Sequence, residues 1–219
     1  MADPAAQSFT ILQLADSAFP TGGFAHSSGL ESARAHGFVP DEKAAAEAVR
    51  DSVVACAHGP LVFVRVLHAA PASTDDEHAP HDATLDAFLS SPVANRASRV
   101  LGRSLRAAAE HVFCIQIPAP LRHQATVFAA VTRALAVPIV DARRLFLFQH
   151  LRSVLSAAVR LGIFGPLEAQ ALQHDLGPSL DAVLERTAAL GADDLAQTSP
   201  LLELYGARHD TLYSRLFMS

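Results

Sequence analysis

The residue types best suited to chemistry are two histidines and one carboxylate. His26 and Glu31 lie in the segment Gln13–Glu31, QLADSAFPTGGFAHSSGLE, and His209 lies near the other end of the chain. Imidazole and carboxylate groups serve as general acids and bases and as metal ligands. A metal-dependent hydrolase that uses these three residues is therefore one hypothesis. The segment matches neither a phosphate-binding loop nor a nucleophile elbow, since it lacks the required lysine and glycine positions.

A second set of possible ligands lies in Ala70–Asp82, APASTDDEHAPHD, where His78 and His81 stand beside Asp75, Asp76 and Glu77. The segment is polar and contains proline, which predicts an exposed loop over residues 70–82. A metallochaperone that holds its metal ion here is another hypothesis. Nothing in the sequence pre-organises four ligands, and no H-E-x-x-H pair occurs. We therefore expect no metal site and no cofactor.

The segment Gln13–Glu31 also carries local structural signals. Pro20, Gly22 and Gly23 predict a turn, with positive φ or close approach of another chain segment at the two glycines. Ser28 and Glu31 have the S-x-x-E spacing of a capping box, in which Glu31 would accept the backbone N–H of Ser28. Glu31 is thus either a helix cap or a contact for a partner.

Composition excludes several classes of protein. The chain has 219 residues, of which half are hydrophobic and 18% are charged, and its net charge is −5. This chain can bury a core, and nothing in its charge predicts nucleic-acid binding. We expect no signal peptide and no membrane span, because no basic and apolar leader occurs and no apolar run reaches about 20 residues. Cys56 and Cys114 fit buried thiols in a reducing compartment, so a cytoplasmic location is expected.

The elements that position these residues are predicted to be helices. Leu147, Leu151, Val154 and Ala158 recur at helical spacing, and a similar stripe runs through Pro92–Val112. Prolines stand where helices would begin, at positions 40, 60, 92, 166 and 200. Strand and hairpin signals are weak. The prediction is all-α: residues 1–219 form a single-domain bundle of about eight to ten helices.

Four arginines, Arg96, Arg99, Arg103 and Arg106, step by three, four and three residues and so line one helical face. Such a stripe could clamp the carboxylates of a partner, because a guanidinium binds a carboxylate through two parallel hydrogen bonds. The alternative is a solvated face opposite the apolar stripe.

The segment Gln13–Glu31 resembles the N-terminal signature of the UreF family of urease accessory proteins. The matching positions are Gln13, Leu14, Pro20, Gly22, Gly23, Phe24, Ser27, Gly29, Leu30 and Glu31. His26 stands where many members carry tyrosine. Three further blocks follow in the family's order. Their matching positions are Arg99, Gly102 and Leu105; Arg160, Leu161, Gly162, Gly165 and Gln170; and Pro200, His209, Arg215, Leu216, Phe217 and Ser219.

This resemblance implies an all-α homodimer without catalytic activity of its own. It implies a scaffold that joins UreD (UreH in some bacteria) and the GTPase UreG, and that helps deliver nickel to apo-urease. The residues that it places in partner binding are Phe24, His26, Glu31, Arg99, Arg160, His209, Arg215, Leu216 and Phe217, with Pro20, Gly22, Gly23 and Gly29 forming a structural turn. Residues 201–219 carry apolar side chains that are costly to leave in water, so this tail should dock either on the protein's own core or in a groove on UreD. The resemblance favours the second, a partner-binding tail.

Overall fold

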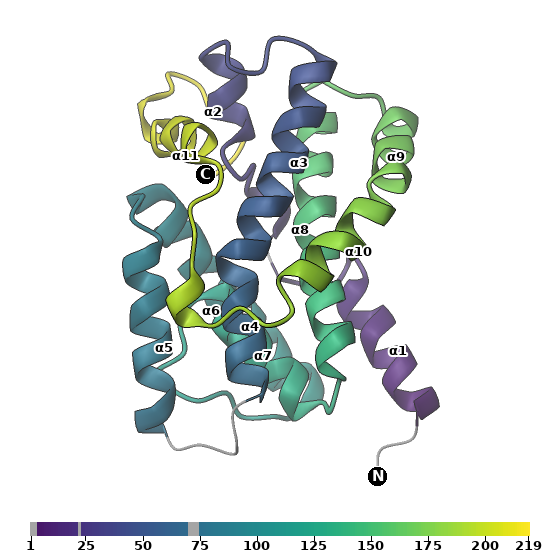
Figure 1. Cartoon of the computed structure of the whole chain (residues 1–219), viewed down its shortest axis with the longest axis vertical. Coiled ribbons are helices and arrows are strands. Elements are labelled where there is room, and N and C mark those ends of the chain that lie inside the picture. Colours follow the sequence, from purple (N-terminus) through teal and green to yellow (C-terminus); the bar gives the residue numbers. More distant parts are fainter. Residues whose placement is uncertain (1–3, 22, 70–74) are drawn as a thin grey trace.

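The computed structural model describes residues 4–21, 23–69 and 75–219, and the side chains of residues 4–8 and 75–77 are not described. In these ranges all regular structure is helical, which confirms the all-α prediction (Figure 1). The α-helices are α1 Pro4–Ala15, α2 Leu30–Ala35, α3 Glu42–His58, α4 Pro60–Ala69, α5 Asp75–Phe88, α6 Pro92–Phe113, α7 Gln124–Ala134, α8 Ile139–Arg160, α9 Pro166–Asp175, α10 Gly177–Arg186 and α11 Pro200–Ala207. Three short 3-10 segments, Gly23–Ala25, Ala192–Asp194 and His209–Thr211, complete the order.

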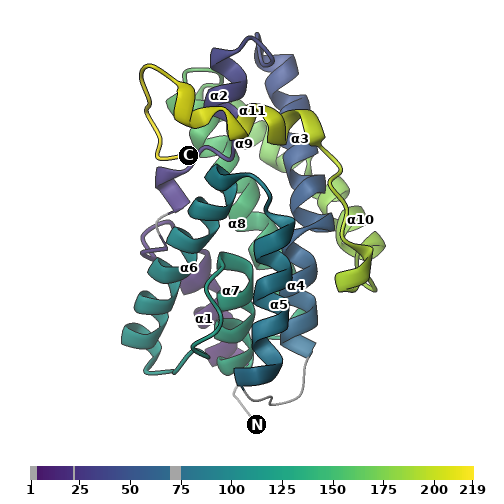
Figure 2. The same ribbon diagram turned by 90° about the vertical axis from the view of Figure 1, so that its left-hand side faces the viewer.

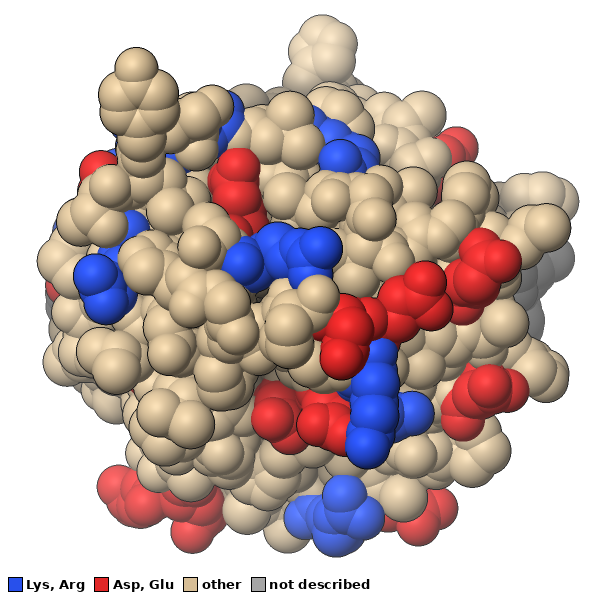
Figure 3. Space-filling view, turned by 90° about the horizontal axis from the view of Figure 1, so that it is seen from above, with Lys and Arg blue, Asp and Glu red and all other residues tan. Residues whose placement is uncertain are grey.

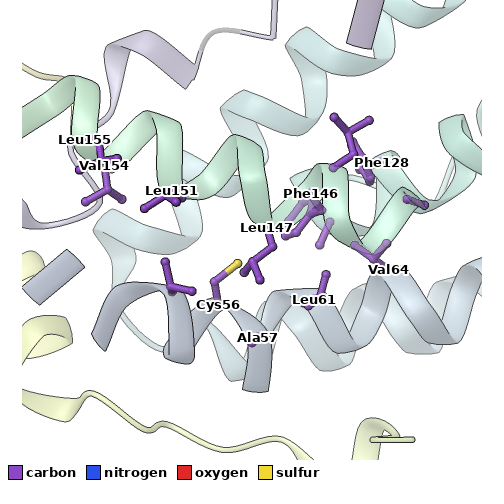
Figure 4. Close-up of a cluster of buried hydrophobic side chains, with 14 of the residues drawn as sticks. Cys56, Ala57, Leu61, Val64, Phe128, Phe146, Leu147, Leu151, Val154 and Leu155 are labelled. Carbon is purple, nitrogen blue, oxygen red and sulfur yellow. The ribbon is translucent and has the colours of Figure 1, made fainter. Parts of the chain in front are cut away.

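Helix α8 lies at the centre of the bundle and contacts α3, α4, α7 and α9. Its residues at helical spacing, Leu147, Leu151, Val154 and Ala158, are all buried, as the periodicity predicts. They pack against Cys56 of α3 and Leu61 of α4, and Phe146 of α8 meets Phe128 of α7 edge to face with ring centroids 5.1 Å apart (Figure 4). This core is the rigid base on which the remaining helices are placed.

The prolines mark helix starts as the sequence indicates. Pro60, Pro92, Pro166 and Pro200 are the first residues of α4, α6, α9 and α11, where the missing N–H of proline costs no intrahelical hydrogen bond. Pro40 stands just before α3, whose N-cap is Asp41; the Asp41 side chain accepts the N–H of Ala44.

The predicted exposed loop over residues 70–82 is wrong for the part that the structure describes. Residues 75–82 form the first turns of α5, and Pro80 lies inside that helix. Asp82 is buried because it accepts the backbone N–H groups of Arg122 and His123 and the hydroxyl of Thr126. His78 is buried too. A carboxylate that receives so many donors from the start of α7 fixes this polar segment against the bundle. Residues 70–74 lie outside the described residues.

The stretch Glu42–Ala69 has the length and composition of a membrane-crossing helix, the one such stretch among the described residues. An apolar 18-residue part of it is 56% buried within the fold. Because α3 and α4 both pack on α8, this stretch has the position of a core helix pair. The expectation of two buried thiols is only half right: Cys56 is buried, but Cys114 is exposed after the end of α6.

Candidate functional site

The first feature of interest is the buried carboxylate of Glu31, which holds the C-terminal segment against the N-terminal turn. His209 Nε2 donates to Oε2 of Glu31 at 2.9 Å. The backbone N–H of Leu216 donates to Oε1 at 2.5 Å, and that of Phe217 donates to Oε2 at 3.2 Å. Both carboxylate oxygens are therefore used inside the chain. We call the contact between residues 23–31 and 209–219 the tail junction.

Backbone hydrogen bonds extend the tail junction beyond Glu31. Met218 N donates to the carbonyl of Ala25 at 2.8 Å, and Ser27 donates to the carbonyl of Ser219 through both its backbone N–H and its hydroxyl. His26 Nδ1 lies 2.5 Å from the hydroxyl of Ser219. Figures 1 and 2 both show the last residues running back to lie beside α2. The tail thus docks on its own chain, without regular secondary structure after Thr211.

Arg160, at the last residue of α8, lies between two aromatic rings of the tail junction. Its guanidinium carbon is 4.1 Å from the ring centroid of Phe24 and 4.1 Å from that of Phe217. Arg160 also donates to the carbonyl of Phe24 at 2.6 Å. Cation–π contacts of this kind stabilise by roughly 0.5–2 kcal/mol each. The contact connects the turn, the tail and the central helix in one unit.

The glycine that the junction requires is Gly29. It has φ 85° and is the N-cap of α2, and a Cβ there would lie 3.1 Å from Cα of Gly206 in α11. The prediction of positive φ or close approach at Gly23 is wrong, because a Cβ on Gly23 would meet only ordinary contacts and its φ is not positive. Gly22 lies outside the described residues. Pro20 precedes the short 3-10 segment Gly23–Ala25.

The capping-box interpretation of Glu31 is also wrong. The start of α2 has no side-chain cap hydrogen bond, and Ser28 adopts a left-handed conformation with φ 53°. The carboxylate instead reaches His209, 178 residues away. Glu31 is therefore a structural contact within the chain, which neither interpretation from the sequence anticipated.

Exposure divides the predicted partner-binding residues into two groups. Phe24 is 72% exposed and Leu216 is 53% exposed, and both are available at the surface. The others at the junction centre, His26, Glu31, His209 and Phe217, are buried. Tyr213 and Met218 add exposed apolar surface beside them. The buried group positions the tail, and the exposed group forms its outer face.

Arg215 lies at the edge of the tail junction and is bound to the chain's own acid. Its guanidinium is 3.2 Å from Asp210, which also accepts two hydrogen bonds of 2.9 Å from Arg96. All three side chains are about half exposed, so each ion pair contributes little to stability. Asp210 is a contact that sequence reasoning missed, although it follows His209 directly. Figure 3, viewed from above, shows acidic and basic side chains interspersed on that face.

Arg99 lies apart from the tail junction and connects α6 to α5. It donates to Asp86, which also accepts from Asn95 and lies 2.9 Å from His123 Nε2. The Arg99 hydrogen bond holds the pKa of Asp86 well below its usual range. The arginine stripe is therefore not simply a solvated face, and its arginines are not all free to bind a partner, because some of them already bind groups of this chain. Arg106, for example, donates to the carbonyls of Ile117, Pro118 and Leu121.

The hydrolase hypothesis requires His26, Glu31 and His209 to act as a ligand or acid–base set. The structure brings them together, but no group of three or more His, Cys, Asp or Glu side chains in the described residues is arranged to hold a metal ion. Burial, together with the electrostatic influence of the nearby His209 and Arg96, lowers the pKa of His26. The Glu31 oxygens are already occupied. These side chains therefore hold the tail against the rest of the chain.

Comparison with known proteins gives matches over most of the chain. The UreF family model matches residues 39–177. A urease accessory protein F from Arabidopsis thaliana is 36% identical over 221 residues, with 94% of this chain and 90% of the relative covered. One from Oryza sativa subsp. indica is 33% identical, covering 94% and 82%, and the UreF of Arthrobacter sp. (strain FB24) is 31% identical with both chains fully covered. The chain belongs to the UreF family.

The two segments of the tail junction, residues 23–31 and 209–219, lie outside the part matched by the UreF family model but within the alignment that covers the whole chain. UreF relatives are named as accessory proteins of urease, which agrees with a non-catalytic role. The two blocks of UreF-like residues at the ends of the sequence, one with Glu31 and one with His209, Leu216 and Phe217, meet at this junction. Their order along the chain gives no hint of that contact.

Proposed function

We propose that this chain is a cytoplasmic scaffold for urease maturation, which assembles with UreD (UreH) and the GTPase UreG and helps deliver nickel to apo-urease. In this proposal it acts as a homodimer and without catalysis of its own. The names of the relatives support a role in urease maturation. The exposed face of the tail junction supports a role in binding partner proteins.

The observation that carries the proposal is the construction of the tail junction. Buried polar groups hold a short tail in place, while the side chains of Phe24, Tyr213, Leu216 and Met218 remain exposed. Exposed apolar side chains that cluster on a rigid support are typical of protein-binding surfaces. We assign this face to UreD. The flanking Arg160 and Arg215 would contact carboxylates at its rim.

The coupling to UreG rests on thermodynamic reasoning. A scaffold can link the nucleotide state of a GTPase to metal release only if it binds one nucleotide state better than the other. The test is to measure UreG binding to the scaffold with GDP and with a non-hydrolysable GTP analogue. Equal affinities in both states would remove the coupling from the proposal.

The decisive experiment uses two exposed positions and a remote control. The double variant Phe24→Ser/Leu216→Ser should keep the fold and lose co-purification of UreD and urease activation in a urease-positive host. Val140→Ser is the matched control, since Val140 is 54% exposed at the other end of α8. It lies roughly 30 Å from Arg160 at 1.5 Å rise per residue. Retention of UreD by a folded double variant would remove this face from the interface.

A further inference from the structure

An open groove lies where α5 ends and α6 begins, and three arginines of α6 line it: Arg96, Arg99 and Arg103. Asp86 of α5 is the one acid among the lining residues. At a rise of 1.5 Å per residue, the three arginines are spread over about 10 Å of the helix. The groove therefore presents a short row of guanidinium groups. We call it the basic groove.

Arg103 is the arginine of the basic groove that has no partner within the described part of the chain. It is exposed, and no hydrogen bond or ion pair joins it to another described residue. Arg99, by contrast, is bound to Asp86. A guanidinium offers several N–H donors in a planar array that fits a carboxylate. Arg103 can therefore accept a carboxylate without giving up a contact of its own.

The tail shows how a carboxylate binds at the edge of the basic groove. Nη2 of Arg96 donates to both carboxylate oxygens of Asp210 at 2.9 Å. Both side chains are about half exposed, 50% for Arg96 and 44% for Asp210. An ion pair so exposed contributes little to stability, since water screens it. A carboxylate from another protein can therefore replace Asp210 at little cost.

The charges at and beside the basic groove do not cancel. Asp210 is shared between Arg96 and Arg215, and the hydroxyl of Ser90 donates to Glu203 of α11 at 3.4 Å. The charged groups are thus four arginines and three carboxylates: Arg96, Arg99, Arg103, Arg215, Asp86, Asp210 and Glu203. A positive charge remains over, on a chain whose net charge is −5. Such a local excess selects acidic partners and orients them on an otherwise negative protein.

We propose that the basic groove binds an acidic segment of a partner protein, whose carboxylates pair with Arg103 and replace Asp210 on Arg96. Because Asp210 belongs to the tail, occupancy of the groove competes with one of the contacts that hold the tail. The groove lies on α5 and α6 and meets the tail junction at Asp210. It is a second binding surface beside the face assigned to UreD.

The experiment titrates the full chain into a fluorescein-labelled, alanine-based helical peptide that carries glutamates at positions i, i+3 and i+7, the spacing of the three arginines. Binding is followed by fluorescence anisotropy. A peptide with glutamine at the same positions is the control probe. We expect saturable binding of the glutamate peptide, weakened by added salt, and none of the glutamine peptide. Absence of binding, or equal binding of the two peptides, would overturn the proposal. The titration contains no UreD, so its outcome is independent of the face assigned to UreD.

Two variants test the residues. Arg103→Gln should weaken the glutamate peptide about threefold to fivefold, the effect of one exposed ion pair, and leave the melting temperature unchanged because Arg103 has no partner to lose. The matched control is Arg186→Gln, an exposed arginine of α10 that also has no partner among the described residues and lies on the far side of the bundle from α6 (Figure 2). It should leave the affinity within the error of the wild-type value. Equal losses in both variants would overturn the assignment to the groove.

Asp210→Asn should strengthen peptide binding about twofold, because it frees Arg96 from the chain's own carboxylate. Circular dichroism melts establish that the variant is folded. An unchanged or weaker affinity in a folded Asp210→Asn protein would overturn the exchange at Arg96. Displacement of the peptide by inorganic phosphate at equal concentration would show a general anion site and overturn the assignment to an acidic protein segment.

Discussion

His209 and Glu31, 178 residues apart in the chain, form a buried contact with 2.9 Å between Nε2 and Oε2. His209 is fully buried and its Nδ1 has no partner among the described residues. The same carboxylate accepts two backbone N–H groups of the tail. Glu31 therefore acts on the tail as a helix-capping side chain acts on a helix end: it satisfies backbone donors that would otherwise be buried without acceptors.

Glu31→Gln should loosen the tail without unfolding the bundle. The amide keeps one acceptor oxygen but loses the negative charge, and hydrogen bonds to charged groups contribute about 1.5–3 kcal/mol. We expect faster hydrogen–deuterium exchange at the amides of Leu216 and Phe217, with a small drop in melting temperature. Glu47→Gln, on an exposed acid of α3, is the control. Unchanged exchange at both amides would show that Glu31 does not hold the tail.

Gly29→Ala should destabilise the protein more than Gly37→Ala. Both glycines have positive φ, 85° and 77°, but a Cβ at Gly37 meets nothing within 4 Å, whereas one at Gly29 meets the backbone of Gly206 at 3.1 Å. The left-handed conformation alone costs a non-glycine residue about 1–2 kcal/mol. Gly37→Ala measures that cost by urea unfolding. An equal loss in both variants would mean that α2 and α11 can separate at little cost.

His150 should make stability depend on pH below neutrality. Burial lowers its pKa to about 4 from 6.5. The unfolded chain therefore binds a proton at His150 between these values and the folded chain does not, so stability falls as pH drops below about 6.5 and is unaffected above it. At pH 5 this amounts to about 2 kcal/mol relative to pH 8, from about 1.4 kcal/mol per pKa unit.

The measurement compares urea unfolding of the wild-type and His150→Met across pH 5–8. Carboxylates also titrate near pH 5, but they do so in both proteins. The difference between the two stability curves therefore isolates the contribution of His150. Parallel stability curves would show that the imidazole is protonated in the folded protein.

Removal of residues 208–219 should leave a folded, helical protein that no longer holds UreD and does not support urease activation. The core around α8 does not include the tail, but the cut exposes Glu31 and removes Phe217 from Arg160. We expect a lower melting temperature with little loss of helix by circular dichroism. Aggregation of the truncated chain would place the tail in the core. Continued co-purification with UreD would remove the tail from the interface.

The sequence by itself determined the all-helical class, several of the helices and the family. Helical periodicity is a local property, so the buried face of α8 and the proline-led starts of α4, α6, α9 and α11 follow from nearby residues alone. Family membership follows from residue order, which needs no structure. Helical periodicity and the family's motifs can both be read within short segments of the chain.

Only the tertiary structure decided what the singled-out residues do. The partners of Glu31 lie 178 to 186 residues away. No local pattern could therefore distinguish a helix-capping carboxylate from one that holds the tail. Asp82 lies in a polar segment that reads as a loop, but donors from residues 122–126 bury it in a helix. Gly29 is required because α11 crosses it closely, a contact set by packing of distant helices. In each case the deciding interaction joins segments that are far apart in the chain.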